Sequence, residues 1–176
     1  DFGIPQGIYS VNRDYSKTYT FDEFVAMYYG LNTALANAIE TAGRQNGMLG
    51  QAVQLWDMGG SCPNILGVSL EMDIMLFEDT AGPVAYMNDA GVQQAWKNTG
   101  LLSSFEPHNN GLLMHGQIPG HHCGPIQVVG MMMPFERMLI TFVINSYQSV
   151  EEQEIREIVE ITVPYALINM FIYELR

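Results

Sequence analysis

The chain has 176 residues, of which 48% are apolar and only 15% are charged. This length is typical of one domain, and a chain of this size buries about two-thirds of the surface that it exposes when unfolded. Nineteen acidic residues against seven basic ones give a net charge of −12. Because such a chain repels phosphate backbones, we exclude nucleic acid as a main partner. The longest apolar stretches, 128–133 and 163–168, are too short for a membrane span.

The N-terminal part predicts an arm followed by a helix. Residues 1–19 contain glycines and a proline without any periodic pattern, so we expect an irregular arm packed on one domain of residues 20–176. Thr20 and Glu23 have the spacing of a capping box. A single helix that ends near 43–47 is expected, because apolar residues then recur at helical spacing: Phe24, Tyr28, Leu31, Leu35 and Ile39.

The middle of the chain contains the clearest strand pattern. Apolar residues at the even positions of 68–76 alternate with mostly polar ones, which predicts an antiparallel strand with a buried even face and a wet odd face. A turn at 78–83 then leads into 84–87, which we interpret as the second strand of a hairpin. Asn88 or Asp89 is expected to cap a short helix that ends at Gly100.

The last part predicts a loop, two strands and a helix. Residues 103–125 are rich in Gly, Pro, Asn and His and are expected to form a loop. Residues 126–133 and 137–146 have strand patterns and are separated by a short turn. A final helix begins near Ser149 and is apolar on nearly every side over 165–175.

This order of elements predicts an α+β fold. We expect a single antiparallel sheet of about five strands, flanked by N-terminal and C-terminal helices. The element order is similar to that of PAS, GAF and profilin-like domains. That likeness is an analogy in order alone, because no family motif accompanies it.

All four histidines lie within fifteen residues, and a cysteine follows the last of them. Imidazole and thiolate are common ligands of zinc, copper and iron, and a Gly-Pro-rich loop can fold around one ion. The candidate metal ligands are therefore His108, His115, His121, His122 and Cys123. Their spacing matches no known zinc or blue-copper pattern. The alternative is a polar loop whose histidines bond to backbone and water while Cys123 pairs with Cys62.

Methionine is abundant, with twelve residues in the chain. Most are expected in the core, where flexible thioethers fill irregular gaps. Residues 131–133 must alternate between the faces of their strand, so at least one of them points away from the core. We name Met114, Met131 and Met133 as candidate cofactor-binding residues, with zinc, copper or haem as candidate cofactors.

Glu71 and Asp73 lie two residues apart on the predicted wet face of the strand at 68–76. They are therefore side by side, as a carboxylate pair or a hard-cation site requires. The ordinary alternative is that water solvates both of them.

Three functions are compatible with these features. The first is a non-catalytic, sensor-like domain that binds a small ligand, cofactor or metal, with the loop 108–123 at the site. The second is a structural subunit, such as a homo-oligomer, that associates through its apolar final helix. The third is a metal-dependent hydrolytic enzyme with a histidine-bound zinc ion and Glu106 or Asp73 as the base. An even cysteine count fits one disulfide in an exported protein about as well as two free thiols in a cytosolic one, so the location stays open, with a slight preference for a secreted or periplasmic protein.

Overall fold

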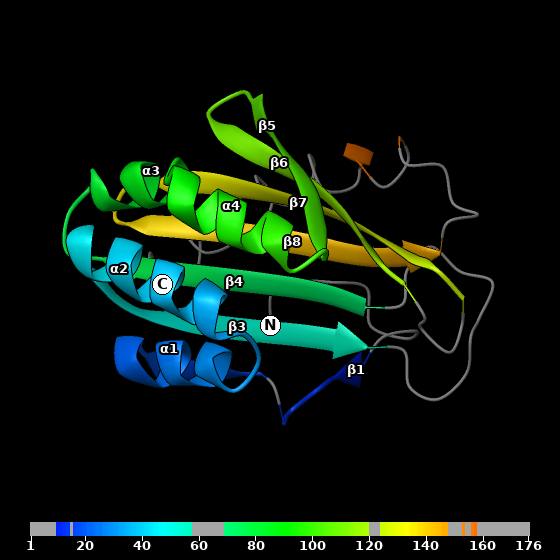
Figure 1. The fold of residues 1–176 in the computed structure, drawn as a ribbon, viewed down its shortest axis with the longest axis horizontal. Coiled ribbons are helices and arrows are strands. Elements are labelled where there is room, and N and C mark those ends of the chain that lie inside the picture. Colours follow the sequence, from blue (N-terminus) through cyan, green and yellow to red (C-terminus); the bar gives the residue numbers. More distant parts are fainter. Residues whose placement is uncertain are drawn as a thin grey trace, which may run out of the picture.

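The computed structural model describes residues 10–14, 16–57, 69–119, 124–147, 153, 156 and 157. The helices cover one face of a twisted sheet (Figure 1). The elements in chain order are β1 (Ser10–Val11), β2 (Lys17–Thr20), α1 (Phe21–Tyr29), α2 (Thr33–Gln45), β3 (Met48–Asp57), β4 (Ser69–Phe77), α3 (Gly82–Met87), α4 (Ala90–Asn98), β5 (Leu102–His108), β6 (Gly111–Ile118), β7 (Ile126–Phe135) and β8 (Met138–Tyr147).

The strands form one antiparallel sheet in the order β1-β3-β4-β8-β7-β6-β5, with β2 also paired to β3. The α+β class and the single antiparallel sheet are therefore confirmed. The predicted number of about five strands is too low, since the described residues contain eight. The strands β4 and β8 pair at the middle of the sheet, where Asp73 lies opposite Thr141.

Two of the missed strands lie in the segment that we predicted to be an irregular arm. β1 and β2 both pair with β3, and Tyr19 of β2 is opposite Gln51. Strands of two and four residues are too short to show a period of two, so their pairing partner decides their conformation. The domain boundary after residue 19 stays a prediction.

Two further strands, β5 and β6, lie in the predicted loop 103–125. They form a hairpin in which His108 pairs with Gly111, and Asn109 takes a left-handed conformation with φ of 51° at the turn. The Gly, Asn and His residues of this segment interrupt the alternating pattern from which a strand is predicted. Here β6 gains a second partner, because Leu113 pairs with Met131 of β7, so tertiary pairing outweighs local propensity.

The helices also differ from the prediction at two places. The expected single helix over 20–43 is divided at Gly30–Asn32 into α1 and α2, and the Asn32 side chain caps α2 by accepting from the Leu35 amide at 3.0 Å. Residues 84–87, predicted as a strand, belong to α3. Its first turn contains a proline, and Asp79 Oδ1 accepts hydrogen bonds from the Ala81 and Gly82 amides.

Replacing Thr20 with alanine is expected to destabilise the domain by about 1 kcal/mol. The capping box is formed, because Thr20 Oγ1 accepts from the Glu23 amide at 3.4 Å and Glu23 Oε2 accepts from the Thr20 amide at 2.8 Å. Urea unfolding measures the change. Thr33→Ala, at an exposed position in α2, is the matched control, and equal losses in both variants would contradict the role of the cap.

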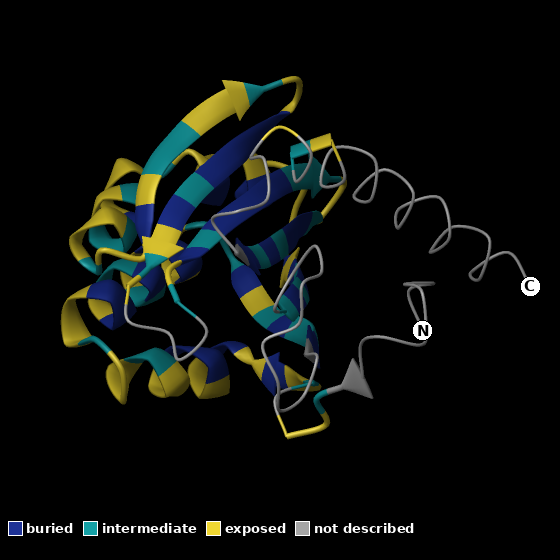
Figure 2. Cartoon of the chain, turned by 90° about the vertical axis from the view of Figure 1, so that its right-hand side faces the viewer, coloured by how far each residue is buried: buried dark blue, intermediate teal, exposed yellow. Residues whose placement is uncertain are grey.

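Side chains of β4 alternate between two faces of the sheet. We call the face of Asp73, Met75 and Phe77 the helix face, because α1 to α4 pack over it, and the face of Met72 the far face. Both are buried in the middle of the sheet, as Figure 2 shows by the dark strands. The predicted wet odd face is therefore wrong: Asp73 is only 7% exposed. Alternation shows which side chains share a face, but not what covers that face.

Candidate binding cavity between the sheet and the helices

A cavity of about 170 Å³ lies between the helix face of the sheet and all four helices. It is similar in size to an apolar cavity of about 150 Å³ that accepts benzene. Most of its wall is apolar or aromatic. The residues that line it are Phe24, Tyr28, Ile39, Gln51, Glu71, Asp73, Met75, Tyr86, Val92, Trp96, Leu101, Leu102, Met114, Ile118, Val128, Met132, Thr141 and Val143.

The cavity opens at the end of the sheet where β4 begins and β8 ends. The lining residues at that end are partly exposed, among them Glu71, Ile118 and Val143, and Leu101 is 40% exposed. Glu71 and Val143 are directly opposite each other in the β4–β8 pair. The next pair inward on this face, Asp73 and Thr141, is buried. A ligand would therefore pass Glu71 before it reaches Asp73.

Three buried polar side chains line the cavity from three neighbouring strands. Gln51 of β3, Asp73 of β4 and Thr141 of β8 are 4%, 7% and 4% exposed. Asp73 and Thr141 are directly opposite, so their Cβ atoms are about 5 Å apart. Within the described part of the chain, Gln51 Oε1, Asp73 Oδ1 and Thr141 Oγ1 have no hydrogen-bond partner. A buried polar atom without a partner costs about 1–3 kcal/mol, so a cluster of three calls for an explanation.

Glu71 and Asp73 share a side-chain hydrogen bond. Burial raises the pKa of Asp73 well above its usual range, and the Glu71 charge and the hydrogen bond to Glu71 raise it further, while a hydrogen bond from Gln51 acts in the opposite direction. Burial also raises the pKa of Glu71, whereas the hydrogen bond with Asp73 lowers it. A hydrogen bond between two carboxyl groups needs a proton. Because this hydrogen bond raises the pKa of Asp73 and lowers that of Glu71, the proton lies on Asp73, which donates to the Glu71 carboxylate.

Aromatic rings form the helix side of the cavity. The Phe24 and Tyr28 rings meet edge to face with centroids 5.1 Å apart, and Tyr28 meets Trp96 in the same way at 5.7 Å. Desolvation of the Tyr28 phenol raises its pKa well above the usual value, and the Asp73 and Glu71 charges add to this effect. The phenol therefore stays neutral, and the wall presents polarisable ring faces and edges next to the carboxyl pair.

The methionines named from the sequence lie on different faces of the sheet. Met114 lines the cavity. Met131 and Met133 belong to the far face, where Met131 is buried in one cluster with Leu113 and Phe142. Met132, which lies between them in sequence, lines the cavity instead. A cofactor-binding role for Met114, Met131 and Met133 stays a prediction.

The described histidines are not close together. His108 pairs with Gly111, which lies four residues from His115 along β6, a separation of about 13 Å. Neither histidine lines the cavity. Among the described residues there is no group of three or more His, Cys, Asp or Glu side chains suited to a metal ion.

Several predicted features lie outside the described residues. These are His121, His122, Cys123 and its proposed partner Cys62, and almost all of the final apolar helix from Ser149 onward. The five-residue metal site and association through that helix therefore stay predictions. No helix in the described ranges combines the length and the apolar character that crossing a membrane requires.

Two parts of the cavity were missed by sequence reasoning. Gln51 and Thr141 are polar residues in mostly apolar strands, and a polar residue on a strand's inner face was the available signal. The sequence pattern puts Phe24 and Tyr28 on one side of a predicted helix, but the position of the aromatic wall over Glu71 and Asp73 depends on how α1 and α4 dock on the sheet.

The sequence matches no model of a known protein family, and no relative is found among curated proteins. The fold, however, is similar to a solved structure. It is the extracellular domain of PknH from Mycobacterium tuberculosis, with a TM-score of 0.52 and 10% identity over 93% of this chain and 82% of that chain. At this identity the likeness concerns the fold alone.

Proposed function

We propose that this protein is a non-catalytic domain that binds a small organic molecule in the cavity between its sheet and its helices. The observation that carries the proposal is the set of buried oxygens without partners on Gln51, Asp73 and Thr141, whose side chains line a cavity with mostly apolar and aromatic walls. A few convergent polar groups in an apolar pocket are typical of small-molecule sites. A ligand that fills this space gains dispersion contacts and supplies the missing hydrogen bonds.

Two observations support a location outside the cytoplasm. A similar fold occurs in the extracellular domain of PknH. The even cysteine count is compatible with one disulfide in an exported protein. We therefore keep a secreted or periplasmic location as part of the proposal, and of the loop 108–123 we assign only Met114 and Ile118 to the site.

The methionines provide a direct test of binding. Met75, Met114 and Met132 line the cavity, whereas Met72, Met131 and Met133 lie on the far face. In protein labelled with ¹³C at the methionine methyl groups, benzyl alcohol is a suitable neutral probe, since its ring matches the cavity volume. We expect the first three signals to shift during titration while the far-face signals stay in place.

Replacing Val143 with phenylalanine is expected to weaken this binding by about tenfold or more, because the larger side chain blocks the mouth of the cavity opposite Glu71. The same methyl titration measures it. Val84→Phe is the matched control, since Val84 is 47% exposed on α3 and is not a lining residue. Unchanged affinity in Val143→Phe, or shifts confined to the far-face methionines, would contradict the proposed site.

A further inference from the structure

We propose that the ligand is a small primary amine, whose ammonium group is held at Asp73, Gln51 and Thr141 and whose apolar body lies against the aromatic wall. This inference rests on the proposed function and specifies the chemical class of the ligand. It follows from the charges, the acceptors, the aromatic rings and the volume of the cavity.

The cavity is lined by acidic groups and by no basic side chain of the described residues. Its ionisable lining residues are all acids: the carboxyl groups Glu71 and Asp73 and the phenols Tyr28 and Tyr86. None of the described lining residues is Lys, Arg or His. An anionic ligand would be repelled at this site, whereas the net charge of the chain, −12, attracts cations towards it.

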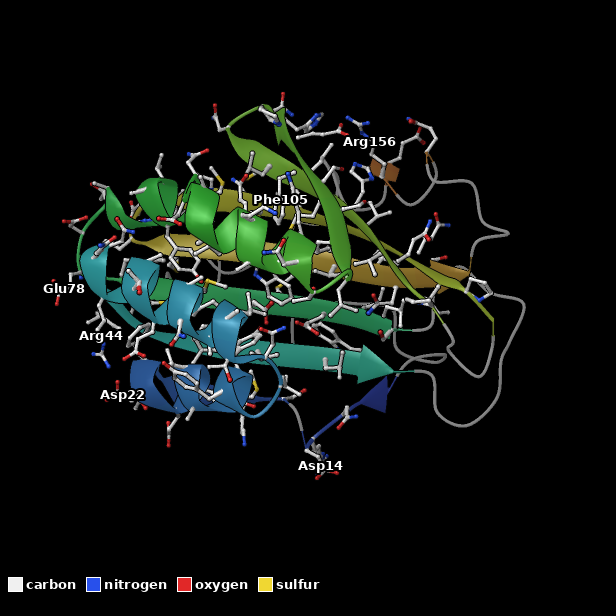
Figure 3. All side chains as sticks on the ribbon, in the orientation of Figure 1. Asp14, Asp22, Arg44, Glu78, Phe105 and Arg156 are labelled. Atoms are coloured by element: carbon white, nitrogen blue, oxygen red, sulfur yellow. The ribbon has the colours of Figure 1, made fainter. Side chains whose placement is uncertain are left out.

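Two basic side chains of the helices interact with groups that do not line the cavity. Arg44 Nη2 lies 3.0 Å from both Asp22 Oδ1 and Glu40 Oε1, and Arg44 and Asp22 lie together at the outer side of α1 and α2 (Figure 3). The Lys97 ammonium lies 5.8 Å from the centroid of the Phe105 ring, and neither residue lines the cavity. The carboxyl pair in the cavity therefore has no counterion among these side chains.

The buried oxygens are suited to a donor with several N–H bonds. Gln51 Oε1 and Asp73 Oδ1 are acceptors, and a threonine hydroxyl oxygen such as Thr141 Oγ1 also accepts. A primary ammonium carries three N–H donors, so it can satisfy all three oxygens. A hydroxyl ligand has one donor and leaves two of them without partners. Charge-assisted hydrogen bonds of this kind are about twice as strong as neutral ones.

The aromatic wall and the volume restrict the rest of the ligand. The Tyr28 and Trp96 rings, with centroids 5.7 Å apart, provide cation–π attraction close to the carboxyl pair. A cavity of about 170 Å³ accepts one six-membered ring with a short arm. Benzylamine matches both requirements, with its ammonium directed to Asp73 and its ring among the apolar side chains.

Binding of the ammonium is expected to release one proton. Asp73 holds a proton in its hydrogen bond with Glu71, and the groups that face the pair are Tyr28 from α1 and Tyr86 from α3, both neutral phenols, with uncharged Gln51 and Thr141 from β3 and β8. When benzylammonium enters, the Asp73 proton passes to the buffer, so that one positive charge replaces another. Calorimetry in buffers of different ionisation enthalpy measures the number of protons that are released when benzylamine binds.

The test compares benzylamine, benzyl alcohol and benzoate on the wild type and on Asp73→Asn. Asparagine can donate to Glu71 and present its oxygen to the cavity as protonated Asp73 does, but it cannot become charged. For the wild type we expect benzylamine to bind at least about tenfold more tightly than benzyl alcohol, and benzoate not to bind. For Asp73→Asn we expect that preference and the proton release to be lost, while benzyl alcohol binds as before.

The outcomes separate this inference from the proposed function. Equal affinity for benzylamine and benzyl alcohol in the wild type, or an unchanged preference in Asp73→Asn, overturns the amine assignment and leaves a binding cavity. If no probe shifts the signals of Met75, Met114 and Met132, the proposed function itself fails. Asp14→Asn controls for the loss of one acid, because Asp14 is exposed beside β1, away from the helices (Figure 3).

Discussion

Replacing Gly116 with alanine is expected to destabilise the domain by about 3 kcal/mol. A Cβ atom at this position in β6 would overlap the carbonyl oxygen of Leu101 and would lie 2.9 Å from Leu102 Cα. These are backbone atoms, so no side-chain rotation relieves the clash. The start of β5 would have to move, and the hydrogen bond from the Gln117 amide to the Leu101 carbonyl, 3.1 Å long, would be lost.

Urea unfolding of Gly116→Ala measures this effect, and the same variant should perturb ligand binding because Leu101 and Leu102 line the cavity. Gly30→Ala is the control. Gly30 has helical angles, φ −69° and ψ −19°, and a Cβ atom there would meet only the Met27 carbonyl oxygen at 3.4 Å. We expect that change to stay within about 0.5 kcal/mol. Equal stability of the two variants would show that β5 does not approach β6 as described.

Replacing Asp73 with asparagine is expected to stabilise the domain at pH 7.5 by about 1–3 kcal/mol, and by much less at pH 4. Burial raises the pKa of Asp73 in the folded state, so folded protein keeps a proton that the unfolded chain has lost. The contribution of Asp73 to stability is therefore complete below the ordinary pKa of an aspartate. It declines as the pH rises towards the raised pKa of the folded state, and asparagine avoids this decline.

Urea unfolding of the wild type and Asp73→Asn at pH 4, 6 and 7.5 tests this expectation. The stability difference should widen with pH, and Asp14→Asn at its exposed position should show no such trend. A constant difference across the range would mean that Asp73 is ionised in the folded protein. The opposite slope, with asparagine less stable at high pH, would mean that Asp73 has a cationic partner.

The stability and the proposed binding place opposite demands on Asp73. A buried carboxyl group without a counterion destabilises the free protein, and the same group would contribute most of the affinity for an amine. Such a residue is hard to explain by folding alone, because asparagine would serve the fold better. Ligand binding and pH-dependent stability of Asp73→Asn therefore report on both roles of this residue.

Some features follow from the sequence because they depend on neighbours along the chain. Asp89 Oδ1 accepts from the Val92 amide at 2.8 Å at the predicted start of α4, and the capping box at Thr20 is formed as expected. The strand patterns predicted at 68–76, 126–133 and 137–146 appear as β4, β7 and β8. Their alternation also places Glu71 and Asp73 side by side, which follows from the period of two in any strand.

Only the tertiary structure decided which face of β4 holds the site. The sequence correctly separates the side of Met72 from the side of Asp73, but the burial of Asp73 depends on α1, α3 and α4, which pack over it from other parts of the chain. The partners of β5 and β6 are likewise remote for a segment whose composition suggests a loop. Caps and alternation depend on covalent neighbours, whereas coverage of a face and pairing of strands depend on distant contacts, so the first are determined by sequence and the second by the fold.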